Sequence, residues 1–312
     1  MGPQTRIVTA GSCFAQQFGQ ALRVRGSSWI CREPAPASLS PEVRRLYGYD
    51  LFSTRTGNIY TARQLRQWIG WSIDREPAPL EMWASRDRYF DPFRPTIEPN
   101  GFHSPEELVR SRATTIACFR DALAEADMLV FTLGLTECWR NAIEDYEYQS
   151  SPSIVEDAFD PERHRFHNQT VGEILGDMNI VFERMRRFNP DLKILLTVSP
   201  VPITATASDH HVLVAMLHTK SVLRAAAGEL AAQHPFCDYF PSYEMVTGPP
   251  FRGMFYAPNL RAVTKHGIDF VMDRFFTAIE HDGRDRVALP ATEPTDMDPL
   301  CDEELLDQFA RL

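Results

Sequence analysis

The sequence has no run of eighteen or more apolar residues, so it lacks a segment that predicts a membrane-spanning helix. A secretory pattern is also missing, because residues 1–6 lead directly into a short apolar stretch, and we expect a cytoplasmic protein. Cationic residues are in deficit: 32 Lys and Arg stand against 42 Asp and Glu, for a formal net charge of −10. Phosphate binding needs clustered cations, so this balance argues against a nucleic-acid-binding surface but not against small substrates.

Cysteine pairs of the kind that bind metals or carry out redox chemistry are absent as well. The six cysteines stand at positions 13, 31, 118, 138, 237 and 301, with no Cys-x-x-Cys motif and no His/Cys cluster at zinc spacing. This distribution predicts isolated thiols in a reducing compartment, and neither a metal nor another cofactor is expected. Cys13 differs from the others in its place, directly after a predicted strand.

The pattern of apolar residues predicts an α/β fold. With 312 residues, 44% of them hydrophobic and 24% charged, the chain can bury a large core. Short buried strands are predicted at residues 6–10, 128–133 and 193–198, with a weaker one at 236–240. Helices are predicted at residues 14–22, 61–73, 105–126, 170–188, 209–233 and 267–279. Helices that alternate with apolar strands indicate a parallel sheet covered on both faces.

Two long stretches interrupt this alternation. Residues 27–105, rich in Pro, Arg and Trp, and residues 140–168 have little periodicity, which is typical of functional insertions or lids. The Pro-rich, acidic tail at 282–312 ends in a short amphipathic segment at 303–312. We expect one domain over residues 1–281, carrying both insertions, followed by this tail.

The loops that follow the predicted strands are the natural place for a site, because ligands of parallel α/β sheets bind beyond the carboxyl ends of the strands. These loops begin with Gly11-Ser12-Cys13, Gly134-Leu135-Thr136-Glu137 and Ser199-Pro200. We expect them to meet at one rim. The helix that starts near Cys13 favours a thiolate, so this thiol is predicted to be partly exposed and reactive. The same residues also fit a tight turn with an N-capping serine, and their spacing leaves both interpretations open.

Five ordered blocks of the sequence carry a family resemblance. They are Gly11-Ser12-Cys13-Phe14-Ala15, Arg55-Thr56-Gly57-Asn58-Ile59-Tyr60-Thr61, Thr132-Leu133-Gly134-Leu135-Thr136-Glu137, Ser199-Pro200-Val201-Pro202 and Tyr239-Phe240-Pro241-Ser242-Tyr243-Glu244. These blocks, within roughly residues 5–277, resemble the GSCFA family, which belongs to the SGNH-like hydrolase group. The resemblance implies a flavodoxin-like, three-layer α/β/α sandwich and acyl-ester chemistry.

The resemblance also assigns positions in the site. Cys13 takes the position of the serine nucleophile in the SGNH pattern, and Ser12 that of the preceding aspartate. Gly134 matches the glycine of the oxyanion-hole block, whereas Thr136 replaces its asparagine. The usual Asp-x-x-His corresponds to Asn-Leu-Arg-Ala at residues 259–262, so neither catalytic residue of that motif is present. The nucleophile therefore needs a base from elsewhere in the chain.

His211 is the predicted base. It stands at the start of the predicted helix at 209–233, after a strand that ends at the rim, and a helix start keeps an imidazole neutral. The GSCFA resemblance also favours it. We expect His211 to hydrogen-bond Cys13 or Ser12, directly or through one water; capping of the helix is the alternative role. His266, four residues beyond the lost motif, is the second candidate, and the histidines at 164, 167, 234 and 281 are expected to face solvent.

Four further rim residues each have a functional and a structural interpretation. Asn58 is a candidate donor to an oxyanion, but Gly-Asn is also an ordinary turn. Glu137 is a candidate for orienting a base or binding substrate, and equally for capping the next helix. Tyr60 and Trp139 form an aromatic wall for sugar or acyl groups in the first interpretation and part of the core in the second.

Together with these residues, the resemblance implies an acyl-ester hydrolase or O-acyltransferase that acts on a small-molecule or glycan acyl substrate. The acyl intermediate is expected on Cys13, with Ser12 as the neighbouring alternative. Hydrolysis and transfer differ only in whether water or another hydroxyl accepts the acyl group, and insertions that exclude water favour transfer. The competing hypothesis is a non-catalytic ligand-binding protein, in which the missing Asp-x-x-His marks a decayed site.

Overall fold

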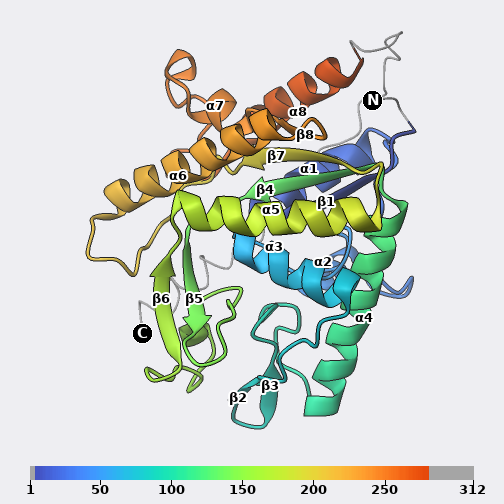
Figure 1. Cartoon of the computed structure of the whole chain (residues 1–312), viewed down its shortest axis with the longest axis vertical. Helices are drawn as coiled ribbons and strands as arrows, with labels where there is room; N and C mark the ends of the chain where they lie inside the picture. The colour runs from blue at the N-terminus through green and yellow to red at the C-terminus, as the bar shows by residue number, and fades with distance from the viewer. Residues whose placement is uncertain (1–3, 281–312) are drawn as a thin grey trace.

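A four-stranded parallel sheet forms the centre of the computed structural model, which describes residues 4–280 (Figure 1). Its strands lie in the order β1 (Ile7–Gly11), β4 (Met128–Leu133), β7 (Lys193–Val198) and β8 (Cys237–Tyr239). β4 has the sequence MLVFTL and is buried along its whole length, as expected for a strand with helices on both faces. The predicted parallel sheet, with three neighbouring central strands, is confirmed.

The order of the strands reverses direction between β1 and β4. After α1 (Cys13–Val24) the chain returns along the outer edge of β1, where Trp29 makes a single parallel bridge to Ile7. It then passes to β4 on the opposite edge of β1 and continues outward to β7 and β8. With Trp29 in the place of a second strand, this is the flavodoxin-like order 2-1-3-4-5, whose switch point lies between β1 and β4. Ligands of such folds bind at the switch point.

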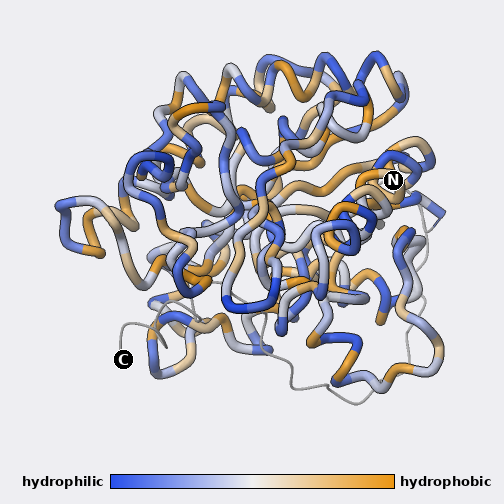
Figure 2. Tube along the Cα trace, turned by 90° about the horizontal axis from the view of Figure 1, so that it is seen from below, coloured by the Kyte–Doolittle hydropathy of each residue, from blue (hydrophilic) through white to orange (hydrophobic). Residues whose placement is uncertain are grey.

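Helices cover both faces of the sheet and make three layers. α3 (Ala62–Ile69), α4 (Pro105–Glu125), α5 (Val171–Phe188) and α6 (Val212–Gln233) pack on one face. α1, α7 (Ser242–Thr247), the 3-10 turn η3 (Pro249–Phe251) and α8 (Lys265–Glu280) pack on the other. Along β4, Leu129 and Phe131 belong to the first core and Met128 and Val130 to the second, because successive side chains point to opposite faces. The predicted α/β/α sandwich is confirmed, and Figure 2 shows hydrophobic segments in its interior.

The stretches at 27–105 and 140–168 contain short elements that the sequence did not predict. These are α2 (Pro41–Leu46), β2 (Trp83–Ser85), β3 (Arg88–Phe90), η2 (Pro152–Ile154) and β6 (His164–Asn168), which pairs with β5 (Glu137–Asn141). β2 and β3 form a second antiparallel pair. α3 continues into the π-helical turn η1 (Gly70–Asp74) and buries Leu65 and Trp68 in the same core as the sheet. α3 is therefore part of the helical layer and not of a lid.

A buried ion network fastens the segment after β3 to α4. Asp91 accepts hydrogen bonds from Arg94 Nε at 2.8 Å and Arg112 Nε at 3.1 Å, and all three side chains are buried. Arg94 also donates to Thr115 Oγ1 at 2.7 Å and to the carbonyl oxygen of Arg55 at 3.5 Å. The network thereby supports the backbone that leads from Arg55 to the rim of the sheet.

Some of the sequence predictions concern membranes and the end of the chain. Within residues 4–280, no helix is both long and apolar enough to cross a membrane. The predicted tail at 282–312, its amphipathic segment at 303–312 and His281 lie outside the described residues.

Candidate functional site

The turn after β1 is fixed against the end of β4. Gly11 has φ +134°, and a Cβ atom on it would lie 2.4 Å from the carbonyl oxygen of Thr132, so only glycine fits there. The next residue, Ser12, donates its backbone N–H to the same oxygen at 3.0 Å. Ser12 is the N-cap residue of α1, and Cys13 is the first residue of that helix. The predicted strand–turn–helix is confirmed, and its turn lies at the switch point.

The second exit, at Gly134, meets this turn directly. A Cβ atom on Gly134 would lie 2.8 Å from Ser12 Cβ and 2.9 Å from Tyr60 Cδ1. The backbone N–H groups of Gly134 and Leu135 both donate to the carbonyl oxygen of Tyr60, at 3.0 and 3.1 Å, and Ile59 N donates to Gly11 O at 2.8 Å. Residues 58–60 therefore join the two exits. The prediction that these exits share one rim is confirmed.

Several polar side chains are buried at this point. Ser12 and Cys13 are each 2% exposed, and Asn58 and Thr136 are buried as well. Ser12 Oγ is shielded from solvent and has no hydrogen-bond partner in the structure. The expectation that the Cys13 thiol is partly exposed is wrong, because the first residues of α1 are covered on all sides. The turn is therefore shielded from bulk water.

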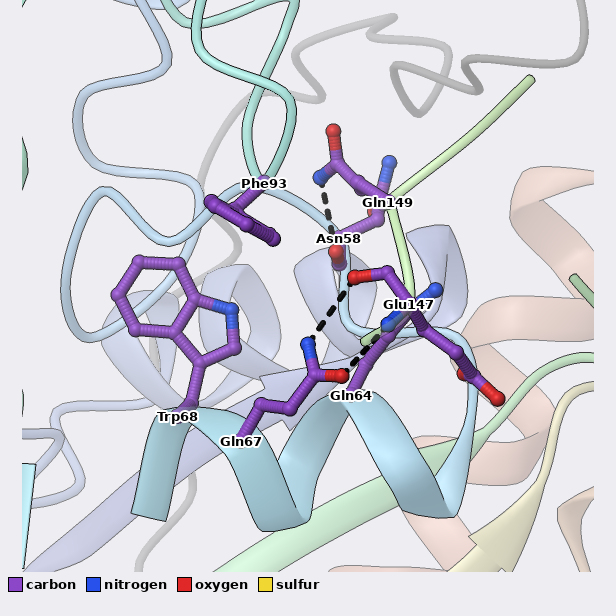
Figure 3. A pocket seen from close by; sticks show the side chains of 7 residues that line it. All are labelled: Asn58, Gln64, Gln67, Trp68, Phe93, Glu147 and Gln149. Carbon is purple, nitrogen blue, oxygen red and sulfur yellow. Dashed lines mark hydrogen bonds between the residues drawn. The ribbon is translucent and has the colours of Figure 1, made fainter. Parts of the chain in front are cut away.

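Asn58 lies at the rim, as predicted, and is held from two directions. Its Oδ1 accepts a hydrogen bond from Gln16 Nε2 on α1 at 3.2 Å. Its carbonyl oxygen accepts one from Gln149 Nε2 at 2.8 Å (Figure 3). Gly57 before it has φ +67°, so the turn interpretation of Gly57-Asn58 also holds. The turn places the asparagine between α1 and the sheet.

A network of buried amides and one carboxylate lies behind Asn58, on α3 and the strand-like segment 146–149 (Figure 3). Gln64 Oε1 accepts from Tyr60 N at 2.8 Å, and Gln67 Nε2 donates to the carbonyl oxygen of Glu147 at 3.0 Å. The Glu147 carboxylate is fully buried and binds Arg140 at 2.9 Å. The space between these side chains is too small for a water molecule, and their hydrogen bonds hold the backbone of the rim. Sequence reasoning missed it.

α6 contributes two side chains at the exit of β4. Thr219 Oγ1 lies 2.9 Å from Thr136 Oγ1, and Lys220 Nζ donates to the carbonyl oxygen of Gly134 at 2.9 Å. Both residues are buried. Thr136 is therefore at the predicted rim, with its hydroxyl bonded to α6. Sequence reasoning missed Lys220, although its position next to Thr219 and between Ala215 and Leu223, on the buried face of α6, was the available signal.

Glu137 does not cap a helix, because β5 follows β4 directly. The carboxylate of Glu137, which is half-buried, accepts a hydrogen bond from Thr206 Oγ1 at 2.6 Å. Thr206 belongs to the loop between β7 and α6, in which Ile203 is buried. Glu137 thus ties this loop to the second exit.

His211 occupies the N-cap position of α6, the capping role that was its alternative interpretation. Its side chain is exposed, and Nδ1 accepts a hydrogen bond from Leu213 N at 3.2 Å. The predicted direct hydrogen bond to Ser12 is absent, because Ser12 Oγ has no partner. α6 begins beyond the ends of β4 and β7 (Figure 1). An α-helix rises about 13 Å over the nine residues from His211 to Lys220, which leaves His211 outside the rim.

The second candidate base, His266, and the described histidines expected to face solvent also have partners of their own. His266 is exposed on α8, with its ring 5.5 Å from that of Phe255. His164 is buried, against expectation, because Nδ1 accepts from Asp160 N at 3.0 Å and the ring packs on Tyr148. His167 is half-buried and bonds Glu173 at 2.8 Å, and His234 bonds Asn179 at 2.8 Å.

The remaining motif residues have structural contacts. Asn259 Oδ1 accepts from the backbone N–H groups of Arg261 and Ala262, both at 3.0 Å, so it shapes a turn. Trp139 packs on Phe159 and Phe166 in the β5–β6 pair, with ring centroids 5.6 and 6.0 Å away, which is the core interpretation. Over the described residues, no group of three His, Cys, Asp or Glu side chains is arranged to hold a metal ion.

Comparison with known proteins agrees with this geometry. No curated protein matches the chain. The sequence profile of the GSCFA family matches residues 6–275, which cover β1, β4, β7, β8 and most of the helices between and after them. The chain belongs to the GSCFA family.

Proposed function

We propose that this chain is an acyl-ester hydrolase or O-acyltransferase whose nucleophile comes from the Ser12-Cys13 turn. The observation that carries the proposal is the position of that turn: it starts α1 at the switch point of the sheet, against Gly134. Membership of the GSCFA family, in the SGNH-like hydrolase group, supports hydrolase-like chemistry.

The surroundings of the turn suit a developing oxyanion. The N-terminus of a helix carries a partial positive charge and N–H groups without intrahelical partners, which stabilise an anion. Asn58 and Thr136 are the candidate side-chain donors beside it. A threonine hydroxyl can accept a hydrogen bond from Thr219 and donate its own hydrogen to the oxyanion, so the contact between the two threonines is compatible with this role.

Two nucleophiles are available, and they differ in chemistry. Cys13 holds the nucleophile position of the SGNH pattern. Ser12 has the side chain that faces Gly134, and its hydroxyl has no hydrogen-bond partner. A buried hydroxyl without a partner costs free energy, and a catalytic role is one explanation for such a group. The family resemblance therefore favours Cys13 as the nucleophile, whereas the contacts in the structure favour Ser12.

The test uses the full chain and a pair of covalent probes. A small alkyl fluorophosphonate reacts with activated serine, iodoacetamide reacts with thiolate, and peptide mapping locates the adduct. Hydrolysis of p-nitrophenyl acetate is measured in Ser12→Ala and Cys13→Ala, with Cys118→Ala as a cysteine control on α4. We expect turnover to disappear in one of the first two variants, the one whose residue carries the adduct, and to persist in Cys118→Ala. Equal turnover in all three variants would refute the proposal.

A ligand-binding protein without catalysis is the second candidate, and one observation favours it. None of the described histidines is hydrogen-bonded to Ser12 Oγ. In that case simple acyl esters raise the unfolding temperature of the protein and are recovered intact. An enzyme returns them cleaved or transferred to an acceptor.

A further inference from the structure

Lys220 is a buried amine at the switch point. Its side chain is 1% exposed, and Nζ donates to the carbonyl oxygen of Gly134 at 2.9 Å. Lysine is among the residues that proteins bury least, because an ammonium group loses its hydration in the interior. A buried lysine is therefore an uncommon feature, and here its Nζ is bonded at the end of β4.

The composition makes the choice of lysine more informative. The chain has three lysines, at positions 193, 220 and 265, and the other 29 of its 32 cationic residues are arginines. Lys193 and Lys265 are exposed, whereas buried positions that need a permanent cation, such as Arg94 and Arg112, hold arginine. Arginine is always protonated in proteins, but a lysine amine that is removed from water favours its neutral form. The switch point thus carries a lysine, whose neutral amine can accept a proton, and not an arginine.

Gly134 connects this amine to Ser12. The carbonyl oxygen of Gly134 binds Lys220 Nζ, and the α-carbon of the same residue packs against the Ser12 side chain. Ser12 Oγ is buried with no hydrogen-bond partner, and His211 and His266, the predicted bases, are both exposed elsewhere. The four-carbon stem of lysine is flexible, and Nζ and the Ser12 side chain both contact the same residue, Gly134.

We propose, on the basis of the proposed acyl-transfer function, that Lys220 is the proton acceptor for Ser12 and replaces the histidine that this chain lacks. Neutral Nζ takes the proton of the Ser12 hydroxyl while Oγ forms a bond to the acyl carbon. The ester C–O bond then breaks, and the ammonium group returns the proton to the leaving alkoxide. In the second half, Nζ takes a proton from water or an acceptor hydroxyl while that oxygen forms a bond to the acyl carbon. The acyl–Oγ bond then breaks, and the ammonium group returns the proton to Ser12 Oγ.

The first test measures how fast Ser12 is modified by the alkyl fluorophosphonate as a function of pH. In the chain without substitutions, the rate of Ser12 modification rises with pH to a plateau as the amine becomes neutral. Lys220→Met removes the amine and Lys220→Arg keeps a permanent charge, and both should slow modification about 100-fold or more and abolish the rise. Lys265→Met, an exposed lysine on α8, is the matched control and should behave as the unmodified chain.

A second test separates proton transfer from a structural role. Lys220→Ala leaves space for a small primary amine, so methylamine and ethylamine should restore modification of Ser12 in proportion to their basicity. A lysine that merely holds the Gly134 carbonyl gives no such dependence on basicity. Unfolding temperatures of all variants identify any that do not fold. If Lys220→Met does not fold, the pH profile of Lys220→Arg and the amine rescue of Lys220→Ala carry the test.

The outcomes distinguish this inference from the proposed function. Slow, pH-independent modification with rescue by amines supports Lys220 as the base. The inference is overturned if Ser12 of Lys220→Arg or Lys220→Met is modified at the parent's rate and with the parent's pH profile. It is also overturned if iodoacetamide modifies Cys13 and Ser12 does not react. Both results leave the proposed function standing. A chain in which neither Ser12 nor Cys13 reacts overturns the proposed function itself.

Discussion

The ion network around Asp91 allows a sharp prediction about stability. Asp91 bonds two buried guanidinium groups: Arg94 Nε lies 2.8 Å from one carboxylate oxygen, and an Nη atom of Arg112 lies 2.9 Å from the other. Asp91→Asn removes the negative charge and directs an amide toward one of these donors. Two buried cations then share less counter-charge, and breaking a buried pair in this way costs about 3–5 kcal/mol.

The matched control is Asp145→Asn. Asp145 pairs with Arg63 at 2.6 Å, but its side chain is 75% exposed, and surface pairs contribute about 0–1 kcal/mol. The unfolding temperature at pH 7 should fall by roughly 6–20 °C in Asp91→Asn, because each kcal/mol lost lowers it by about 2–4 °C. If the free energy of unfolding of Asp91→Asn lies within about 1 kcal/mol of the parent's, the reasoning is contradicted, because a surface pair contributes that much.

The same variant tests the sign of the pH dependence. Burial by itself raises the pKa of Asp91, but the guanidinium groups of Arg112 and Arg94 outweigh it and hold the pKa below its ordinary value. The stabilisation is therefore complete above the unfolded pKa, about 4, and is lost as the pH falls toward the lower folded value. We expect urea unfolding of the parent to become easier below about pH 4, and the Asp91→Asn protein to lack this component.

Three further changes test the rim. Gly134→Ala drives a Cβ atom into Ser12, which should cost about 1–3 kcal/mol of stability and block covalent modification of the turn. In Gly176→Ala on α5, the control, the added Cβ meets no atom within 4 Å and should be tolerated. Equal modification of the turn in both variants refutes the packing argument. His211→Ala removes an N-cap and should lower the free energy of unfolding by about 1 kcal/mol with turnover unchanged; a large loss of turnover in a folded protein would restore the predicted base. Glu137→Ala frees the loop at Thr206 and should speed covalent modification of the turn; an unchanged rate means that the loop does not limit access.

The sequence predicts the frame of this fold well because the frame depends on local patterns. The strands at 128–133 and 193–198 were predicted with the bounds that β4 and β7 have, since a strand buried on both faces is a continuous apolar run. α5 begins with a capping box of Thr170 and Glu173, a signal that is also local. β5 and β6 escaped prediction because Glu137, Arg140 and their neighbours alternate without a clear apolar face.

The arrangement of the site was predictable only for residues that adjacent strands bring side by side. Ser12 and Gly134 follow neighbouring strands, so the sheet alone brings them together. Lys220 lies 86 residues from its partner Gly134 and depends on how α6 packs, which no local pattern reveals. His211 failed as a predicted neighbour for a related reason: α6 has 22 residues, about 33 Å, whereas β7 has six, about 20 Å, so the helix starts well beyond the rim.

The burial of the turn bears on the choice between hydrolysis and transfer. Ser12, Cys13 and Lys220 are each 1–2% exposed, so bulk water does not reach them. An acyl group held on Ser12 in such a site meets only an acceptor that the protein itself binds, and exclusion of water protects it from hydrolysis. Transfer on the proposed acyl intermediate exceeds hydrolysis only if the acceptor binds before water reaches the acyl group. Under the proposed function, the burial of the turn therefore favours transfer over hydrolysis.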